Sequence, residues 1–477
     1  MTFDPGQQGD AVVTASHDPD VTPELRALML EQWASAPAAT SSSDAAAPFC
    51  RRRREQLSRA FPGDVLVVPN GRPKVRSGDT FHPFRPASDH VWLTGNVEPD
   101  SVLVMKPTAT GHDAALYARP RSDRSTEAFY RDRNHGELWV GPRPSLDDIA
   151  ERLQIVTRPL HALEADLEAL DDRRVRVVTG HDPAVEAVVG GVAEHHRELA
   201  VALSELRLIK DEHEVAQLEL AVAATVRGFE ECVRELPVAA SERWIEGTFF
   251  RRARTDGNDI GYGSIVACGH HSTYLHWTHN DGAVRAGDLA LLDMGVESVS
   301  LYTADITRTI PISGHYSAAQ RRVYDAVVDA QQAGIDATRA GVDFLAPHRA
   351  AMAVLSQRLI SWGIVDGLLD DVLATQVHRR YTLHGTSHML GLDVHDCAEA
   401  RNEMYRGGTL AAGMVITVEP GLYFQSDDLT VPAELRGIGV RIEDDVLVTA
   451  DGSRVLSDAL PKRADDVEAW MARLQRR

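Results

Sequence analysis

Apolar residues recur at the spacing of one helix face in the second half of the chain. The segment 211–236, DEHEVAQLELAVAATVRGFEECVREL, keeps this period over its whole length. Similar patterns predict helices near 241–255, 317–340 and 346–362. Shorter apolar runs between and after these segments predict strands, so this half combines both kinds of element.

The first half shows a different pattern, in which short apolar runs are bounded by Gly, Pro and Asp. One polar-capped segment, SLDDIAERL at 145–153, predicts a helix. The predicted strands are DVLVVPNG (64–71), DHVWLTGN (89–96), SVLVMKP (101–107) and RVRVVTG (174–180). This mixture is sufficient for one α/β domain.

Two changes of composition divide the chain. Residues before about 47 are rich in Ser, Ala and Pro, although VTPELRALMLEQW predicts one short helix capped by Thr22. The polar stretch from Arg207 to Glu214 marks a boundary between domains. The predicted parts are a poorly ordered tail (1–47), an N-terminal domain (48–205), a second domain (206–450) and a helical C-terminal tail (451–477).

Composition narrows the possible locations. The chain has 477 residues, of which 43% are hydrophobic and 25% charged, an ordinary balance for a globular protein. No run approaches the roughly 18 apolar residues of a membrane span. The N-terminus lacks the basic start and apolar core of a signal peptide. We therefore expect a cytoplasmic protein without a membrane partner.

Charge and cysteine usage exclude further classes. The net charge of −20 disfavours nucleic acid as a partner. The basic run Arg51–Arg54 is the exception, and we expect it to form a solvated helix face. The cysteines show no CxxC spacing, so they predict neither a zinc knuckle nor a redox motif; they are Cys50, Cys232, Cys268 and Cys397.

Two aspartates interrupt apolar runs that otherwise predict buried strands. Asp293 ends LLDMG, and Asp305 lies in LYTADITRT. The segment from Glu297 to Ser300 is short enough for a hairpin turn, which would let the aspartates face each other. Two buried carboxylates repel unless a proton or a cation compensates them. Taken alone, the pair is equally consistent with solvated side chains.

Histidines and further acids follow in the same domain. TLHGTSHMLGLDVHD supplies His384, His388 and His395, and its glycines and serine argue against a regular helix. A lone histidine is usually structural, but three in one glycine-rich segment favour a site. Glu419 follows an apolar run in GMVITVEPGLYF.

The last acidic motif is GIGVRIEDDVLVT, where Arg441 and Glu443 share one strand face and could form a simple ion pair. Together with the other motifs, Glu443 completes four carboxylates and one imidazole. Two divalent ions would balance four negative charges. Oxygen-rich ligation with a single histidine suits Mn²⁺, Co²⁺ or a similar ion. The inward set is Asp293, Asp305, His388, Glu419 and Glu443.

Five ordered motifs resemble the metallopeptidases of the pita-bread fold, and within them the Xaa-Pro aminopeptidase (aminopeptidase P) family. They are LLDMG, YTADITRT, HGTSHMLGLDVHD, VEPGLYF and GIGVRIEDD, within about 212–450. Upstream, FRPASDHVWLTGNVEPDSVLVM is similar to the N-terminal domain that this family shares with creatinase and prolidase. The resemblance implies an α+β protein, with a creatinase-like α/β domain before a pita-bread catalytic domain.

The resemblance also implies roles at the matching positions. Asp293 would bind one metal ion, His388 and Glu419 the other, and Asp305 and Glu443 would bridge both. Glu419 would also accept the proton of the nucleophilic water. His276, in YLHWTHND, would lie near the substrate, and His395 would contact the scissile carbonyl region. The residues that would shape the pocket after the cut are His384, Arg441 and Tyr423.

The implied function is a dinuclear, metal-dependent aminopeptidase. It would hydrolyse the N-terminal Xaa-Pro bond through a metal-bridging hydroxide, most simply with two Mn²⁺ ions. Its partners would be peptides with proline second, and the family favours homo-oligomers, dimers or tetramers. The alternatives are an Xaa-Pro dipeptidase (prolidase) and, further away, a non-catalytic pita-bread binding module. Creatinase is disfavoured because all five ligands are present here.

Three departures from the family pattern accompany the resemblance. The spacing between Asp293 and Asp305 is one residue longer than usual, which suggests a bulge in the hairpin. Trp277 stands where family members often have tyrosine, so we include it in the substrate pocket. The N-terminal tail is longer than the family domain requires, and the sequence assigns it no function.

Overall fold

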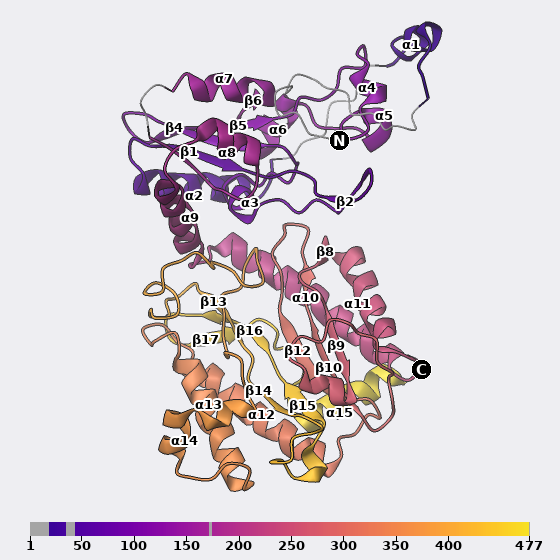
Figure 1. Ribbon diagram of the computed structural model, residues 1–477, viewed down its shortest axis with the longest axis vertical. Helices are drawn as coiled ribbons and strands as arrows, with labels where there is room; N and C mark the ends of the chain where they lie inside the picture. The colour runs from indigo at the N-terminus through magenta and orange to yellow at the C-terminus, as the bar shows by residue number, and fades with distance from the viewer. Residues whose placement is uncertain (1–18, 35–42, 171–173, 477) are drawn as a thin grey trace. The chain divides into compact units, whose positions relative to one another are not determined.

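The computed structural model describes residues 19–34, 43–170 and 174–476, and within it the chain divides into two compact units, Met1–Leu203 and Ser204–Arg477 (Figure 1). Most of the predicted N-terminal tail therefore lies outside the described residues. The short helix expected near Thr22 is confirmed as α1 (Pro23–Met29), capped by the Thr22 side chain.

The first unit is built on one five-stranded sheet in the order β6-β5-β4-β1-β7. The strands β1, β4 and β7 are three of the four predicted ones, and α6 is the predicted helix, with a capping box between Ser145 and Asp148. Valines from β1, β4 and β7 pack with Tyr117, Leu163 and Leu167 into the core.

The elements of the first unit, continuing into the helix that leaves it, are as follows. The strands are β1 (Val65–Pro69), β2 (Val75–Ser77), β3 (Thr80–Phe81), β4 (Val102–Pro107), β5 (His112–Ala118), β6 (Val156–Pro159) and β7 (Val175–Val177). The helices after α1 are α2 (Ala47–Ala60), α3 (Ser88–Thr94), α4 (Ala128–Arg131), α5 (Glu137–Val140), α6 (Leu146–Leu153), α7 (Leu163–Glu168), α8 (Pro183–Val189) and α9 (Ala193–Arg207).

The strand predicted at DHVWLTGN is wrong, because this segment forms helix α3. Gly95 ends the helix in a left-handed conformation, with φ 72°, and donates its N–H to the Val91 carbonyl. Arg53 and Arg54 then donate to the carbonyl groups of Trp92 and Leu93, at 3.1 and 2.6 Å. The basic run is therefore only partly a solvated face, since these two arginines are buried against the end of α3.

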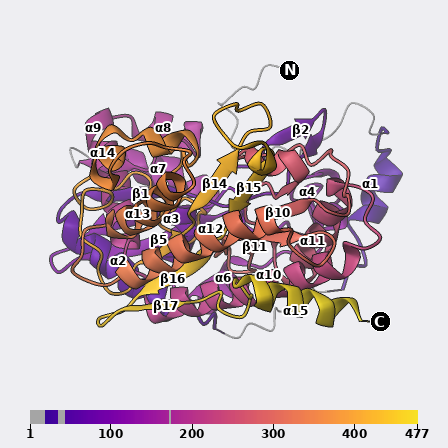
Figure 2. The same cartoon turned by 90° about the horizontal axis from the view of Figure 1, so that it is seen from below.

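The second unit packs paired helices around several small sheets (Figure 1). Helix α10 packs on α11, and α12 packs on α13 and on β13, β14 and β15. Helix α15 contacts both α10 and α12, and Figure 2 shows it beside them. The C-terminal helix is thus part of the core, where Val467, Trp470 and Met471 are buried.

The bounds of the second unit agree with the predicted periodicity. The helices are α10 (Glu212–Glu235), α11 (Glu242–Asp256), α12 (Ala318–Ala337), α13 (Ala346–Ser361), α14 (Leu369–Thr375) and α15 (Ala464–Gln475). The strands are β8 (Asp259–Ile260), β9 (Ile265–Cys268), β10 (Leu289–Met294), β11 (Val296–Glu297), β12 (Ile306–Pro311), β13 (Val415–Val418), β14 (Gly421–Phe424), β15 (Ile438–Arg441), β16 (Asp444–Val448) and β17 (Ser453–Val455). Over the described part of the chain, no helix combines the length and apolar character that crossing a membrane requires.

Candidate metal centre

The two aspartates lie on a buried antiparallel hairpin of β10 and β12. Asp293 pairs in register with Thr307, and Asp305 immediately precedes β12. The aspartates are therefore diagonal neighbours rather than directly opposed, as the sequence had suggested. The ladder keeps one register from Met294–Ile306 to the bridge between Glu297 and Thr303.

The bulge suggested by the longer spacing is consequently not present between the aspartates. The longer spacing is taken up at the tip of the hairpin. There Leu301 is buried with φ 72°, and its N–H donates to the Ser298 carbonyl. Asp305 therefore keeps its place on the face of the sheet that carries Asp293.

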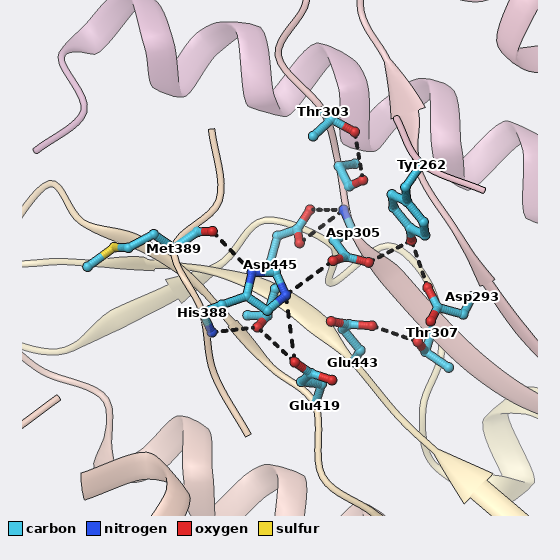
Figure 3. A network of polar contacts seen from close by, with 12 residues as sticks. Tyr262, Asp293, Thr303, Asp305, Thr307, His388, Met389, Glu419, Glu443 and Asp445 are labelled. Atoms are coloured by element: carbon cyan, nitrogen blue, oxygen red, sulfur yellow. Dashed lines mark hydrogen bonds and ion pairs between the residues drawn. The ribbon is translucent and has the colours of Figure 1, made fainter. Parts of the chain in front are cut away.

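A tyrosine that the sequence did not single out joins the two aspartates. The hydroxyl oxygen of Tyr262 lies 2.7 Å from Asp293 Oδ1 and 2.6 Å from Asp305 Oδ1 (Figure 3). A phenol has one hydrogen to donate, so it can satisfy only one of these oxygens at a time. The second carboxylate oxygen requires a proton or a cation.

His388 is oriented to present its Nε2 atom to the same cluster. Its segment pairs beside β13, where the N–H of Thr417 donates to the His388 carbonyl at 3.0 Å. The Nδ1 atom lies 3.0 Å from the Met389 carbonyl, which fixes that nitrogen as the donor in a neutral ring. Nε2 then carries the lone pair, 3.4 Å from Asp305 Oδ2 and 3.6 Å from Glu419 Oε1 (Figure 3).

Glu443 completes the centre from the turn between β15 and β16. Its Oε2 atom accepts a hydrogen bond of 2.6 Å from the Thr307 hydroxyl. Asp305, His388 and Glu443 each offer one ligand atom, and these atoms all lie within 4.8 Å of one another. The structure therefore brings together side chains from three motifs that are separated by up to 138 positions in the sequence.

The electrostatics of this cluster show a shortage of positive charge. Burial raises the pKa of Asp293 and raises that of Glu419 to about 7, while burial and neighbouring carboxylates raise the pKa of Glu443. Burial opposes protonation of His388, but Asp305 and Glu419 raise its pKa to about 9. Hard, oxygen-rich donors with one correctly oriented imidazole fit divalent cations.

A chain of hydrogen bonds leads from the centre to the expected pocket. Arg441 does not pair with Glu443; its Nη2 lies 2.5 Å from Asp293 Oδ2, and its Nη1 donates to the Tyr423 hydroxyl at 3.0 Å. That hydroxyl lies 2.7 Å from His384 Nε2. Burial, with Arg441 second, lowers the pKa of His384 to about 3, so the ring is neutral.

The other histidines flank this arrangement. The ring of His395 meets that of His388 edge to face, with centroids 4.5 Å apart. His276 is exposed, and after burial and His388 it also helps lower the pKa of His395. Trp277 instead donates its indole N–H to Glu242 at 2.9 Å and packs near Tyr423, so it supports the pocket wall.

Buried polar residues that the motifs did not reveal support the ligands from behind. The backbone N–H of Asp305 points at the Asp445 carboxylate, 3.2 and 3.3 Å from its two oxygens (Figure 3). Arg308 donates to the Glu443 carbonyl at 2.7 Å and to Asp444 Oδ1 at 2.7 Å. The adjacent acids in IEDD were visible in the sequence, but their separate partners depend on the fold.

Comparisons with known proteins agree across both units. The model of metallopeptidase family M24 matches residues 216–450, and that of the aminopeptidase P N-terminal domain matches residues 50–178. Xaa-Pro aminopeptidase 1 of Streptomyces coelicolor is 53% identical over 461 residues, 96% of this chain and 94% of that relative. Xaa-Pro aminopeptidase 2 of the same organism is 52% identical over 458 residues, 95% of this chain and 97% of that relative.

Solved structures give the same picture. Aminopeptidase P from E. coli with the inhibitor Pro-Leu matches with a TM-score of 0.82 and 29% identity, covering 91% of this chain and all of that one (100%). The predicted fold is confirmed: an aminopeptidase P-type N-terminal domain precedes a pita-bread domain of mixed helices and strands.

Proposed function

Since the chain belongs to metallopeptidase family M24 and is a metal-dependent aminopeptidase, we propose that it removes the N-terminal residue from peptides in which proline is second. Similarity to Xaa-Pro aminopeptidases over nearly the whole chain supports this specificity. The observation that carries it within the structure is the cluster of Asp305, His388 and Glu443, next to a neutral His384 and the Tyr423 hydroxyl.

The proposed ligands are two divalent ions, with manganese as the resident metal. Asp293 would hold one ion, His388 and Glu419 the other, and Asp305 and Glu443 both. When bound, the ions supply charge compensation and a water of lowered pKa as the nucleophile. The buried carboxylates and the Nε2 orientation of His388 support this assignment.

The protein's own residues then position the substrate and move the proton. Glu419, on the edge of the cluster beside His388, would accept the proton of the attacking water at its carboxylate. His395 would stabilise the charge that develops on the scissile carbonyl oxygen. Arg441 fixes Asp293 and orients the Tyr423 hydroxyl through one guanidinium group.

Proline specificity has a physical basis in this arrangement. The bond before proline is a tertiary amide without an N–H, so a site cannot hold it through that donor. The rings of His384 and Tyr423, which meet edge to face with centroids 5.5 Å apart, offer a flat surface for the pyrrolidine ring. With His395 they form the proposed pocket for the residue after the cut.

A substrate panel tests the proposal. Metal-stripped protein reloaded with Mn²⁺ should cleave Xaa-Pro-Xaa tripeptides and leave Xaa-Ala-Xaa tripeptides intact. Cleavage of Xaa-Pro dipeptides alone would instead identify a prolidase. No cleavage of any Xaa-Pro peptide by the reloaded protein would favour the binding module. The oligomer proposed from the family, a dimer or tetramer, is measured by light scattering on the same preparation.

A further inference from the structure

A buried carboxylate directly follows His395 in the chain. Asp396 is 2% exposed, and both of its oxygens are used. Arg207 Nη2 donates to Oδ1, and Lys210 Nζ donates to Oδ2 at 3.0 Å. Lys210 is itself 4% exposed and also donates to the Arg207 carbonyl at 2.8 Å. None of these three side chains touches the metal ligands in the contacts described above.

Three charges in one buried place need a reason beyond stability. Burial alone would raise the pKa of Asp396, but Arg207 and Lys210 keep it below its usual value. Buried ion pairs often stabilise a fold no more than well-packed apolar residues would, because the charges lose their hydration. What such a group reliably supplies is a fixed geometry, since each partner has one arrangement that satisfies it.

The geometry fixed here is that of the segment 388–397, defined as the histidine loop. At its start, the N–H of Asp396 donates to the Met389 carbonyl at 2.9 Å, which closes the loop on itself. Within it, the Gly391 carbonyl accepts the Thr303 N–H at 3.0 Å, two residues before Asp305. The loop therefore contacts the hairpin that carries the aspartates.

Gly391 shows how closely Asp396 is packed in this loop. A Cβ atom at Gly391 would lie 2.1 Å from Asp396 Oδ2 and 3.2 Å from Lys210 Cε. The carboxylate and the lysine thus fill the space that any side chain at position 391 would need. Moving Asp396 would move the backbone next to His395, because the two residues share a peptide bond.

We infer that Asp396, held by Arg207 and Lys210, is a positioning residue that fixes the histidine loop so that His395 lies against His388 and faces the substrate carbonyl. The inference rests on the proposed function, because it gives meaning to the orientation of His395. It assigns the polar stretch that begins at Arg207 a part in turnover, although that stretch contributes no group to the reaction.

The first experiment compares two isosteric variants in the full-length, Mn²⁺-loaded protein. Asp396→Asn keeps the shape of the side chain but removes its charge. Asp393→Asn is the matched control, because Asp393 also contacts Arg207, at 2.9 Å, while its side chain is 45% exposed. For Asp396→Asn we expect kcat on an Xaa-Pro-Xaa tripeptide to fall by about 10- to 100-fold. KM and bound manganese should stay within about twofold of the parent, and Asp393→Asn should change none of the three.

The second experiment separates positioning from general destabilisation. In a His395→Ala background, Asp396→Asn should cause no further loss of kcat, because there is no imidazole left to orient. Multiplicative losses in the double variant would overturn the inference, as would unchanged kcat in Asp396→Asn. If Asp396→Asn does not fold, Lys210→Met is measured in its place, with the same expected pattern in both backgrounds.

The controls keep the inference distinct from the function on which it rests. An inactive parent, or a His395→Ala variant with normal kcat, would remove the proposed function or the proposed role of His395. An active parent with an impaired His395→Ala variant establishes that premise. Against that background, the Asp396 result supports or overturns the positioning role alone.

Discussion

Replacing Arg308 with methionine tests whether the metal centre depends on a buried arginine beneath it. The side chain is 1% exposed and donates to Asp444 Oδ1 at 2.7 Å. It also donates to the carbonyl groups of Thr307, Glu443, Leu460 and Pro461, at 2.7–3.0 Å. One guanidinium group thus ties the strand after Asp305, the ligand Glu443 and the segment before α15 together. Methionine keeps much of the volume but none of these bonds.

The size of the effect follows from what Arg308 leaves behind. Burial alone would raise the pKa of Asp444, but Arg308 and Lys462 keep it well below its usual range. In Arg308→Met, the fully buried Asp444 keeps Lys462 at 3.1 Å as its remaining cation. Removing one partner of a buried ion pair costs about 3–5 kcal/mol, and we expect a loss of that size in the free energy of unfolding.

Urea denaturation of the full chain, followed by circular dichroism, measures this loss. The matched control is Arg401→Met, because Arg401 pairs with Glu205 on the surface, where its side chain is 56% exposed. The control should leave the unfolding transition almost unchanged. Manganese affinity should fall only in Arg308→Met, since that variant frees the Glu443 backbone. Equal, small effects in both variants would refute the reasoning.

Three further predictions concern charge and catalysis. Burial lowers the pKa of His90 to about 4, below its value in an unfolded chain, so its stabilising effect is complete above about pH 6.5. That effect should be lost as pH falls towards 4, by about 3 kcal/mol, and urea titrations of His90→Gln should show a shallower pH dependence than the parent. Asp305→Asn and Glu443→Gln should each abolish peptide cleavage while circular dichroism stays native; full turnover in both would exclude the two-ion assignment. His395→Ala should lower kcat with bound manganese retained, and elemental analysis showing that it had merely lost its metal would contradict the role of that ring.

The sequence predicted the fold well where local pattern and tertiary packing agree. Helix α10 has a capping box between Asp211 and Glu214 and a regular apolar face, so its bounds were visible in advance. Helix α3 was missed because six of its seven residues are buried, which removes the alternation of exposed and buried positions. Gly95, its left-handed C-cap, was the available signal, while the capping by Arg53 and Arg54 depends on tertiary structure.

The site was predictable to the same extent. Motifs pointed to the residues that the structure gathers in one cluster, because acids at the ends of apolar runs are unusual enough to stand out. Their partners were not predictable, since Tyr262 is an ordinary tyrosine in a short loop until the hairpin brings two carboxylates to its hydroxyl. The diagonal offset of Asp293 and Asp305 also required the strand register.

The most direct test of the central claim is a manganese titration of the metal-stripped protein, with bound metal and cleavage of an Xaa-Pro-Xaa tripeptide measured on the same samples. The account predicts that the first residue is released at full rate only when binding approaches two ions per chain. Full activity in protein that holds less than one ion per chain would contradict it.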